Sequence, residues 1–518
     1  MGKKRIKLLL TLLVLLGLYG FLEWFFSEGN YNPAPQEAPA FPHADARTPD
    51  GDSVWVRAGA HYWRTKAGRF FLGDHYRDVW VARVKAPVFK LDETSGGLTI
   101  KKLGGGMQTV SLTLTDKQGQ SFALRSVDKN PTAVLPPFWQ KTFVAKFVRD
   151  QISGTNPYAA LVVAPLAEAA GIYHANPRLF FVLPSDSSFG QHTQLFANQL
   201  FLFEEKFNNK ESIRKNLGNA IDIDDTEKVL EHVYENPEYQ VDQKLFARCR
   251  LFDIWLGDWD RHEGQWEWAE YEENGINLYK PIPKDRDQAM CHYTDGVIPW
   301  LATRYYHDRK FTGFEKEYPE IEALSYNARF LDARALNSLT WSDFVVQVNY
   351  LKQHLTDAVI EKAVREFPKE VYALLGPVTA EKLKARRNNL MTAAHKYYLH
   401  LAKEVTIAAT DQTELVEIEH LPEKQVRITI SQLLDGAQPV RVLYSRTFYP
   451  AETEKVTVFP LGGNDVVQLS GKATEGVKVT VVVPKGVTLS DNSTGVNQAM
   501  FVPADQVPEF MRVRQREE

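Results

Sequence analysis

The feature that most constrains this chain is an abrupt change from apolar to charged residues at Gly257. The residues before it, Leu251–Leu256, are mostly apolar, and Asp258–His262 then contain two aspartates, one arginine and one histidine. Charged side chains next to a core segment cost free energy unless they are paired or belong to a site. We therefore expect Asp258–His262 to form either a buried network of salt bridges or a polar site at the edge of the core.

A second acidic segment, Asp285–Asp287, follows a short predicted strand over Ile276–Tyr279. Pro281 and Pro283 lie between the two and require an extended, non-helical path. The segment from His262 to the second acidic segment is therefore hairpin-like. Such a hairpin would bring the two acidic clusters together.

Phosphoryl transfer requires a layout of this kind. One carboxylate orients the acceptor hydroxyl and takes its proton, an amide or carboxylate downstream binds a metal ion, and another carboxylate bridges the metal to the phosphates. A cation on a strand holds the phosphates, and a glycine-rich loop covers them. Candidates for every part occur in the order used by protein kinases. The predicted catalytic residues are Asp260, Arg261 and His262, the predicted nucleotide-binding residues are Gly104, Gly105, Gly106, Gln108, Arg125 and Lys129, and the predicted metal ligands are Gln265, Asp285 and Asp287.

The phosphate-binding cation is expected on a predicted strand. Phe122–Arg125 alternates like the V-A-I-K strand of protein kinases, with Arg125 in place of the lysine. Lys129 is an alternative source of the charge. Arginine binds phosphate in bidentate fashion but is not a simple substitute for lysine. The acid that orients this cation is open between Asp150 and Glu168, on the helices expected after the strand.

Each of these patterns also has another interpretation. Gly104–Gly106 fits a plain hairpin turn, Arg125 fits a surface residue of a strand, and the acidic clusters fit a salt-bridge network that holds a helix to a strand. Metallophosphoesterases are a minor alternative, because Gly257–Arg261 imitates their G-D-x-x-D-R motif. The two acids are too close for that motif, however, and no Gly-Asn-His-Glu occurs.

The motif at Gly257–Gln265, G-D-W-D-R-H-x-x-Q, resembles the D-R-H-x-x-N catalytic loop of the atypical kinases. These include phosphoinositide kinases, Golgi secretory-pathway kinases and spore-coat CotH-type kinases. Asp285–Asp287 is similar to the D-x-D metal segment of the CotH-type proteins. The strings at Gly104–Thr109, Arg125–Lys129 and Gly257–Trp266 look closest to an uncharacterised family of exported bacterial proteins with a GDWDRHxxQW motif.

The resemblance spans roughly residues 55–480 and implies an α+β fold, in which a two-lobed protein kinase-like domain is followed by a small all-β domain. It also implies Mg²⁺ or Mn²⁺ with ATP as cofactors. Gln265 departs from the usual asparagine and is longer by a methylene, and no Asp-Phe-Gly is present. We expect an exported kinase-like phosphotransferase that moves a phosphoryl group from a nucleotide to a hydroxyl of an unknown protein, glycan or small molecule.

The N-terminus has the form of an export signal. The basic residues of Lys3–Lys7 precede the apolar stretch Leu8–Leu22, which fits either a cleaved signal or an uncleaved anchor. We expect the chain to be periplasmic, membrane-anchored or at the cell surface, with the membrane as a partner if the anchor is kept. The predicted divisions are a signal peptide or anchor (1–27), a Pro- and Ala-rich linker (28–55), an N-lobe-like β-rich region with helices (56–205), a C-lobe-like helical region with the polar cluster (206–404) and a β-sandwich-like domain (405–518).

Other expectations concern local structure and partners. Alternation predicts a strand over Asp78–Val84, and Pro368 and Pro377 predict breaks in the helical region before the β domain. Cys249 and Cys291 are either two separate buried thiols or a single bridge. The net charge of −4 gives no electrostatic case for a nucleic-acid partner. Because an ATP-dependent reaction is awkward where ATP is scarce, a non-catalytic exported binding or scaffold protein on a kinase-like fold remains the main alternative.

Overall fold

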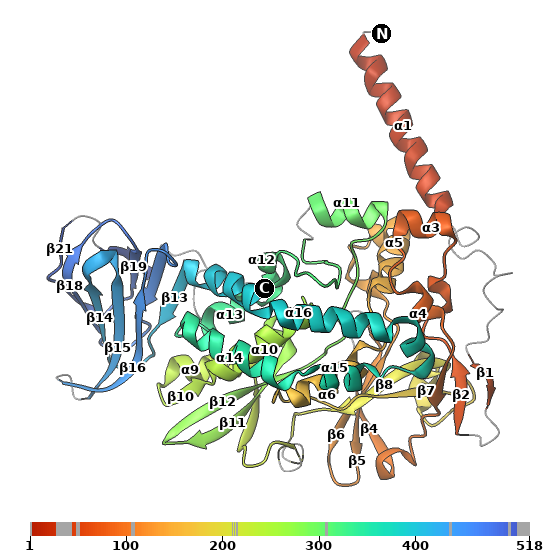
Figure 1. Cartoon of the computed structure of the whole chain (residues 1–518), viewed down its shortest axis with the longest axis horizontal. Coiled ribbons are helices and arrows are strands. Elements are labelled where there is room, and N and C mark those ends of the chain that lie inside the picture. Colours follow the sequence, from red (N-terminus) through yellow and green to blue (C-terminus); the bar gives the residue numbers. More distant parts are fainter. Residues whose placement is uncertain are drawn as a thin grey trace.

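The structure is a computed structural model of the 518-residue chain. It describes residues 3–26, 44–47, 52–104, 109–209, 211, 213, 216–305, 309–434, 438–495 and 499–504. Helices and sheets pack into a larger mixed body, and a smaller all-β unit follows at the C-terminal end of the longest helix (Figure 1). The fold belongs to the α+β class, as predicted.

A five-stranded antiparallel sheet forms the first half of the larger body. Its strand order is β4-β5-β6-β8-β7, which places β6 at the centre. One face of the sheet packs on an aromatic-rich core that includes Phe89, Phe196 and Phe203. The strands are β4 (Leu98–Gly104), β5 (Ser111–Asp116), β6 (Ser121–Ser126), β7 (Arg178–Val182) and β8 (Gln199–Glu205).

Helices connect β6 to β7 and β7 to β8. They are α5 (Phe143–Gln151), α6 (Ala159–Ala169) and the short α7 (Thr193–Phe196). α6 is almost wholly apolar and buries Val162, Val163 and Leu166 in the main core of the molecule.

A small sheet of β1 (Ala44–Arg47), β2 (Ser53–Val56) and β3 (Val84–Pro87) precedes the first sheet, with α3 (Lys66–Leu72) and α4 (Arg77–Val81) between its strands. The strand predicted over Asp78–Val84 is wrong, since α4 occupies most of it. Trp80 and Arg77 are fully buried there, and Trp80 Nε1 donates to the carbonyl of Thr155 at 2.9 Å. Such tertiary contacts override an alternating pattern that is too short to separate a strand from a helix.

A second sheet, with the order β10-β12-β11-β9, lies beside the helix that leads into the polar cluster. Its strands are β9 (Asp222–Asp225), β10 (Tyr239–Val241), β11 (Trp266–Glu273) and β12 (Ile276–Pro283), and its helices are α9 (Thr226–Glu235) and α10 (Gln243–Leu256). Every residue of α10 from Cys249 to Leu256 is buried. Cys249 and Cys291 are both buried and free, so the alternative of a disulfide bridge is wrong.

The remaining helices cover this second half of the body. They are α11 (Val297–Tyr305), α12 (Ile321–Leu324), α13 (Arg329–Ala335), α14 (Trp341–His354), α15 (Asp357–Val364) and α16 (Lys369–Lys403). α16 begins after Pro368 as expected, but it continues through Pro377, so the break predicted there is wrong. Gly376 has no Cβ to clash with the proline ring, and Val371 and Leu383, on either side of the proline, are both buried. Packing along the whole helix thus outweighs a cost of about 3 kcal/mol.

The C-terminal unit has two sheets around a core of its own, which includes Val416, Val456 and Leu469. From β17 to β20 the chain alternates between the two sheets, and each of these strands is parallel to its neighbours, whereas β14, β15 and β16 pair antiparallel. The strands are β13 (Glu404–Ala408), β14 (Glu414–His420), β15 (Val426–Leu434), β16 (Gln438–Phe448), β17 (Lys455–Phe459), β18 (Val466–Ala473), β19 (Lys478–Val483), β20 (Thr488–Asp491), β21 (Thr494–Gly495) and β22 (Met500–Pro503).

The N-terminal helix α1 (Lys3–Phe25) rises away from the body, and only its C-terminal end packs against it (Figure 1). Glu23 accepts a hydrogen bond from the N–H of Phe143 at 2.8 Å, and the Phe26 ring stacks on Phe143 with 6.1 Å between centroids. In the part of the chain that the structure describes, no helix combines the length and the apolar character needed to cross a membrane.

Candidate functional site

The β11–β12 hairpin brings the two acidic segments together. Its strands pair with Trp266 opposite Pro283, and just beyond this pair the N–H of Lys284 donates to the carbonyl of Gln265 at 2.9 Å. Because the residues next to the hairpin are still hydrogen-bonded, the chain segments that contain Asp260 and Asp285 leave it side by side. The meeting of the two clusters expected from the sequence is present in the structure.

Gly257 turns the chain out of α10 and into the cluster. It has a φ of +70°, in the left-handed region, and its N–H donates to the carbonyls of Asp253 and Ile254. A side chain at this position would strain the backbone. The N–H of Asp258 donates to the carbonyl of Asp253 at 2.9 Å, which ends the helix and starts the loop.

Arg261 fastens this loop to the second acidic segment. Its fully buried guanidinium donates to the backbone carbonyls of Lys284 at 2.6 Å, Asp285 at 3.3 Å and Gln265 at 3.2 Å. It also lies over the Trp266 ring, 4.7 Å from the centroid. Asp285 has a φ of +49°, which residues with a side chain rarely adopt, and the bonds from Arg261 help to hold it there.

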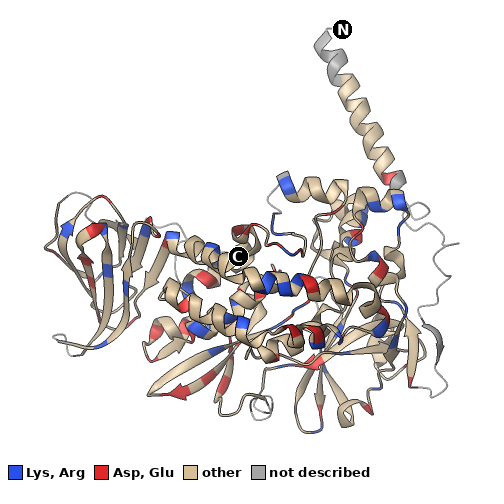
Figure 2. Ribbon diagram, in the orientation of Figure 1, with Lys and Arg blue, Asp and Glu red and all other residues tan. Residues whose placement is uncertain are grey.

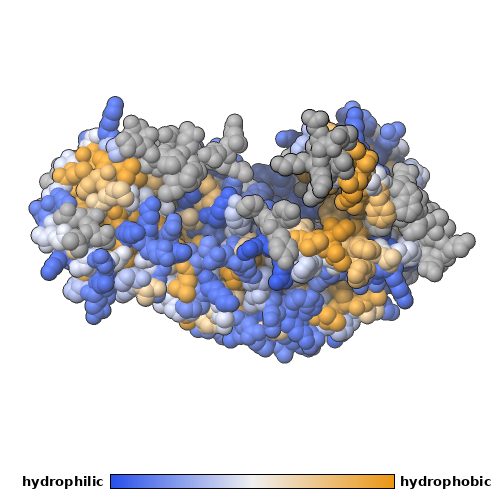
Figure 3. All heavy atoms as spheres, turned by 90° about the horizontal axis from the view of Figure 1, so that it is seen from above, coloured by the Kyte–Doolittle hydropathy of each residue, from blue (hydrophilic) through white to orange (hydrophobic). Residues whose placement is uncertain are grey.

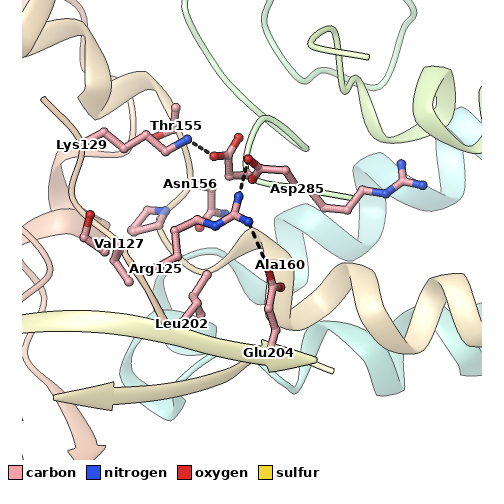
Figure 4. A pocket seen from close by; sticks show the side chains of 13 residues that line it. Arg125, Val127, Lys129, Thr155, Asn156, Ala160, Leu202, Glu204 and Asp285 are labelled. Carbon is pink, nitrogen blue, oxygen red and sulfur yellow. Dashed lines mark hydrogen bonds and ion pairs between the residues drawn. The ribbon is translucent and has the colours of Figure 1, made fainter. Parts of the chain in front are cut away.

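Two cations from the first sheet reach the acidic segment (Figure 4). Arg125 on β6 pairs with Asp285, and Lys129, shortly after β6, pairs with Asp287. A second carboxylate, that of Glu204 on β8, lies 3.6 Å from the guanidinium of Arg125. The fold therefore gathers four of the residues predicted to bind nucleotide or metal.

The glycine-rich turn begins at the level of Arg125 in the sheet. Gly104 ends β4 opposite Ser111 of β5, and Ser111 is in turn opposite Arg125 of β6. A Cβ at Gly104 would lie 2.8 Å from Oγ of Ser111, so a larger residue would displace the serine. The other predicted members of this turn, Gly105, Gly106 and Gln108, lie outside the described residues.

Neither acid expected to orient Arg125 does so. Asp150 is fully buried and pairs with Arg77 at 2.6 Å, and Glu168 is exposed on α6. The acid beside Arg125 is Glu204, which the sequence reasoning missed. The only sign of Glu204 in the sequence is that it forms an acidic pair with Glu205 at the end of a strand. Because side chains alternate along a strand, one of the two lies on each face of the sheet.

Asp260 is half-buried, and its Oδ1 accepts a hydrogen bond from Nδ2 of Asn327 at 2.8 Å. Oδ1 of Asn327 accepts in turn from Nζ of Lys310 at 3.2 Å. Lys310 lies over the Trp259 ring, 5.2 Å from its centroid. Asn327 sits in a short turn between α12 and α13, outside any motif, so the sequence holds no signal that would have identified it.

The other two polar residues of the loop, His262 and Gln265, are half-buried. Nδ1 of His262 accepts from the N–H of Gly264 at 3.1 Å, so the imidazole caps the turn that leads into β11. Gln265 gives its backbone carbonyl to Lys284 and Arg261. The hydrogen bonds of both residues therefore stabilise the conformation of the loop.

Burial controls the ionisation of Asp258, which the sequence reasoning left without a role. Burial raises its pKa to about 6, although the charge of Arg261 opposes this. Its Oδ1 accepts from the N–H of Asp260 at 3.3 Å, and its Oδ2 is buried with no hydrogen-bond partner among the described residues. Arg261 and Arg286 each lie 3.9 Å from Oδ2.

Burial and neighbouring charges shift the pKa values of the groups at the cavity in different directions. Burial alone would raise the pKa of Asp285, but the charges of Arg125, Lys129 and Arg261 hold it below its ordinary value. Burial lowers the pKa of Lys129, while the charges of Asp285 and Asp260 act in the opposite direction. Burial raises the pKa of Glu204. Asp285 is thus ionised at neutral pH because of the cations around it.

The cations and acids line a small cavity of about 30 Å³, which adjoins a cleft of about 130 Å³. Arg125, Glu204 and Asp285 line both. The remainder of the cleft is bordered largely by small side chains, among them Ala123, Ala160, Ala164 and Ala167, and by residues 205–207 at the end of β8 and just after it. An apolar lining with polar groups at one end is typical of the chemistry of small-molecule sites.

Asp285 and Asp287 are the carboxylates of this cavity that suit a divalent cation. Mg²⁺ is commonly held by one or two carboxylates together with the phosphate oxygens of the substrate. No cluster of three or more His, Cys, Asp or Glu side chains that could hold a metal ion occurs within the described ranges. The donor set therefore fits a metal ion that binds together with phosphates.

No protein-family model matches this chain, and no curated protein matches it. Two of the solved structures that share weak similarity with the chain are as follows. The proinflammatory kinase CtkA of Helicobacter pylori is 14% identical with a TM-score of 0.30, over 59% of this chain and 96% of CtkA. HipA of Shewanella oneidensis, in a complex with HipB and operator DNA, is 11% identical with a TM-score of 0.26, over 58% of this chain and 67% of the other.

At these TM-scores neither likeness decides the fold, which rests on the arrangement of its own elements. The glycine-rich segment lies in the sequence between the first two strands of the five-stranded sheet, the cation lies on the third, and helices follow it. This is the order in which protein kinases place their glycine-rich loop, lysine and helix. The α+β fold is therefore compatible with a kinase-like arrangement.

Proposed function

We propose that this chain is a kinase-like phosphotransferase that moves a phosphoryl group from a nucleotide to a hydroxyl acceptor with the help of a divalent cation. The observation that carries the proposal is the meeting of Arg125 with Asp285 and of Lys129 with Asp287 at one cavity. The motif resemblance to the atypical kinases, and to the exported bacterial proteins with the GDWDRHxxQW motif, supports it. We also propose that the chain is exported, because the basic residues of Lys3–Lys7 precede an apolar segment. The leucines of this segment lie exposed on α1.

Nucleotide phosphates would replace the protein carboxylates as the partners of the two cations. Arg125 and Lys129 would turn from their carboxylates to the phosphate oxygens, and Asp285 and Asp287 would then be free to hold Mg²⁺ or Mn²⁺. The bound metal ion supplies positive charge that offsets the charge of the transferring phosphoryl group. The base would lie in the apolar cleft, beside Ala123.

Asp260 is the residue that would orient the acceptor hydroxyl and take its proton. Its half-buried carboxylate keeps one oxygen on Asn327, which fixes its direction. Arg261 contacts backbone carbonyls and buried carboxylates, so we assign it a positioning role in place of a catalytic one. The acceptor itself, whether protein, glycan or small molecule, stays open in this proposal.

The second candidate is a non-catalytic binding or scaffold protein on the same fold. The observation that favours it is the closure of the phosphate end of the cavity by the pairs of Arg125 and Lys129 with Asp285 and Asp287. In that case the paired charged side chains would stabilise the fold, and a nucleotide would not displace them from one another.

Calorimetric titration of ATP into the full chain, with and without Mg²⁺ or Mn²⁺, separates the two candidates. We expect binding that requires the metal ion and is lost in Asp287→Asn. The matched control is Glu419→Gln, which removes an exposed carboxylate of the β unit and should bind as the parent does. Absence of binding of ATP and GTP under all metal conditions would reject the phosphotransferase and favour the scaffold.

A further inference from the structure

The surface around the base of α1 carries large apolar side chains that nothing in the described part of the chain covers. They come from three separate segments: α3, the turn before α5, and α11. We call this surface the aromatic face. Its members and their exposed fractions are Phe70 (63%), Phe71 (43%), Phe138 (72%), Trp139 (41%), Trp300 (42%) and Leu301 (44%).

The direction of α1 relative to this face is fixed by contacts. Phe26, just after the helix, is 1% exposed and packs on Phe143 and Phe147 of α5. Glu23 accepts from the N–H of Phe143, and Tyr19 meets the Phe143 ring edge-on at 5.8 Å. α1 therefore leaves the body from α5, next to the turn that carries Phe138 and Trp139.

The α3 and α11 parts of the face form one unit. A Cβ at Gly296 would lie 2.2 Å from the backbone nitrogen of Gly73, so the two backbones touch. Oδ2 of Asp295 accepts from the N–H groups of Asp74 and His75, both at 2.7 Å. The aromatic residues of these two helices thus keep a common orientation, and an open groove lined by Phe70 and Trp300 runs between them.

The chemistry of the face is that of a membrane interface. Exposed Lys66, Lys141 and Arg304 lie among the aromatic residues, and the Arg304 guanidinium stands 5.2 Å from the Trp300 ring centroid. Aromatic rings with basic side chains between them are typical of the boundary between lipid headgroups and acyl chains. Figure 3 shows hydrophobic residues gathered at the end of the upper surface that carries α1.

α1 continues the same chemistry away from the body. From Leu9 to Leu22 it has no charged residue, and Figure 2 shows the middle part of the helix in tan, with an acidic residue in red at its base. Leu13, Val14 and Leu16 are 57%, 69% and 64% exposed. Apolar side chains at this density need an apolar environment, which an adjoining bilayer would supply.

We propose that the aromatic face rests on the surface of a lipid bilayer, and that the exposed apolar side chains of α1 enter this bilayer without spanning it. Phe70, Phe138 and Trp300 enter the boundary between headgroups and acyl chains, and Lys66, Lys141 and Arg304 meet anionic headgroups. The folded body is therefore held against the bilayer by its own surface as well as by the helix. The proposal does not depend on the phosphotransferase activity.

The test uses single-cysteine variants of the full chain in vesicles of phosphatidylcholine and phosphatidylglycerol. Cys249 and Cys291 are buried, so a polarity-sensitive thiol dye reports on an introduced cysteine. We expect Phe138→Cys and Trp300→Cys labels to be quenched by lipids with brominated acyl chains, by roughly twofold or more for side chains at this depth. Val346→Cys, 61% exposed on α14, is the matched control and should not be quenched.

Two results would overturn the proposal. In one, the labels at 138 and 300 are no more quenched than the label at 346, which means that the face points into water. In the other, the shielding of the labels at 138 and 300 from water depends on the ratio of protein to lipid and disappears at one chain per vesicle. This result means that a second copy of the chain covers the face. Quenching that persists at one chain per vesicle supports contact with lipid.

Discussion

The guanidinium of Arg261 donates a 2.6 Å hydrogen bond to the backbone carbonyl of Lys284, 23 residues further along the chain. This bond crosses from the loop that holds Asp260 to the segment that holds Asp285. The β11–β12 hairpin sets the two segments side by side, and Arg261 fixes their distance from each other. The geometry of the candidate site thus depends on a buried side chain that does not line its cavity.

Replacing Arg261 by methionine should therefore destabilise the fold and weaken nucleotide binding together. The change removes a buried donor from the carbonyls of Lys284 and Asp285 and one of the cations beside Asp253 and Asp258, which we expect to lower the free energy of unfolding by about 3–5 kcal/mol. Denaturant titration measures this loss. Arg329→Met, at an exposed arginine, is the control and should change stability by less than about 0.5 kcal/mol. A loss as small as that of the control would contradict the positioning role.

Asp258 should give the stability a specific dependence on pH. Its pKa in the folded chain is about 6, above the ordinary 3.8. The folded state therefore binds this proton more tightly than the unfolded state, so its contribution to the free energy of unfolding falls as pH rises from about 4 to about 6. Asp258→Asn cannot ionise, and relative to the parent it should gain up to about 3 kcal/mol at pH 7.

Thermal or denaturant unfolding of this variant across that pH range checks the gain. Asp92→Asn, which changes an exposed carboxylate, provides the baseline. Parallel stability profiles for the parent and Asp258→Asn would show that Asp258 is ionised with its ordinary pKa.

Asn327 should act on chemistry through Asp260 without touching nucleotide. A hydrogen bond to a charged group is worth about 1.5–3 kcal/mol, so Asn327→Ala should slow phosphotransfer by roughly 10–100-fold. Asn327→Asp places a second negative charge beside Asp260 and should also slow phosphotransfer, because the carboxylate loses the donor that orients it. Phosphotransfer rates equal to that of the parent in both variants would remove the positioning role.

Arg125 should bind phosphate, and a lysine should serve there in part. Arg125→Gln removes the charge, and we expect nucleotide affinity to fall by roughly 10–100-fold, which corresponds to about 1.5–3 kcal/mol. Arg125→Lys restores the charge without the bidentate geometry and should recover part of the affinity. Arg427→Gln, at an exposed arginine of the β unit, is the control. Equal affinity in Arg125→Gln and the parent would show that the arginine pairs only with protein acids.

The local parts of this fold were accessible from the sequence. The hairpin after His262 and the strand of Arg125 follow from alternation, prolines and turn residues, so the meeting of Asp285 with the Asp260 loop could be anticipated. Lys129 and Asp287 could be anticipated as well, because they lie next to this strand and this hairpin in the sequence.

The remaining parts depend on packing that no local pattern encodes. Asp150 lies on the expected helix, but the face that it occupies turns to Arg77 and away from Arg125. Glu204 and Asn327 reach the site only through the order of strands and the fold of a distant turn. α16 continues through Pro377 because buried residues on both sides hold it together.

The measurement that tests the account most directly is made on Asp260→Asn. This variant keeps the size of the side chain and the hydrogen bond from Asn327 can be retained, but it cannot take a proton. We expect nucleotide affinity and the free energy of unfolding close to those of the parent, with phosphotransfer per folded molecule lower by roughly 10²–10⁴-fold. A stability loss of about 3–5 kcal/mol together with phosphotransfer equal to that of the parent would contradict the account and leave Asp260 as part of a structural salt-bridge network.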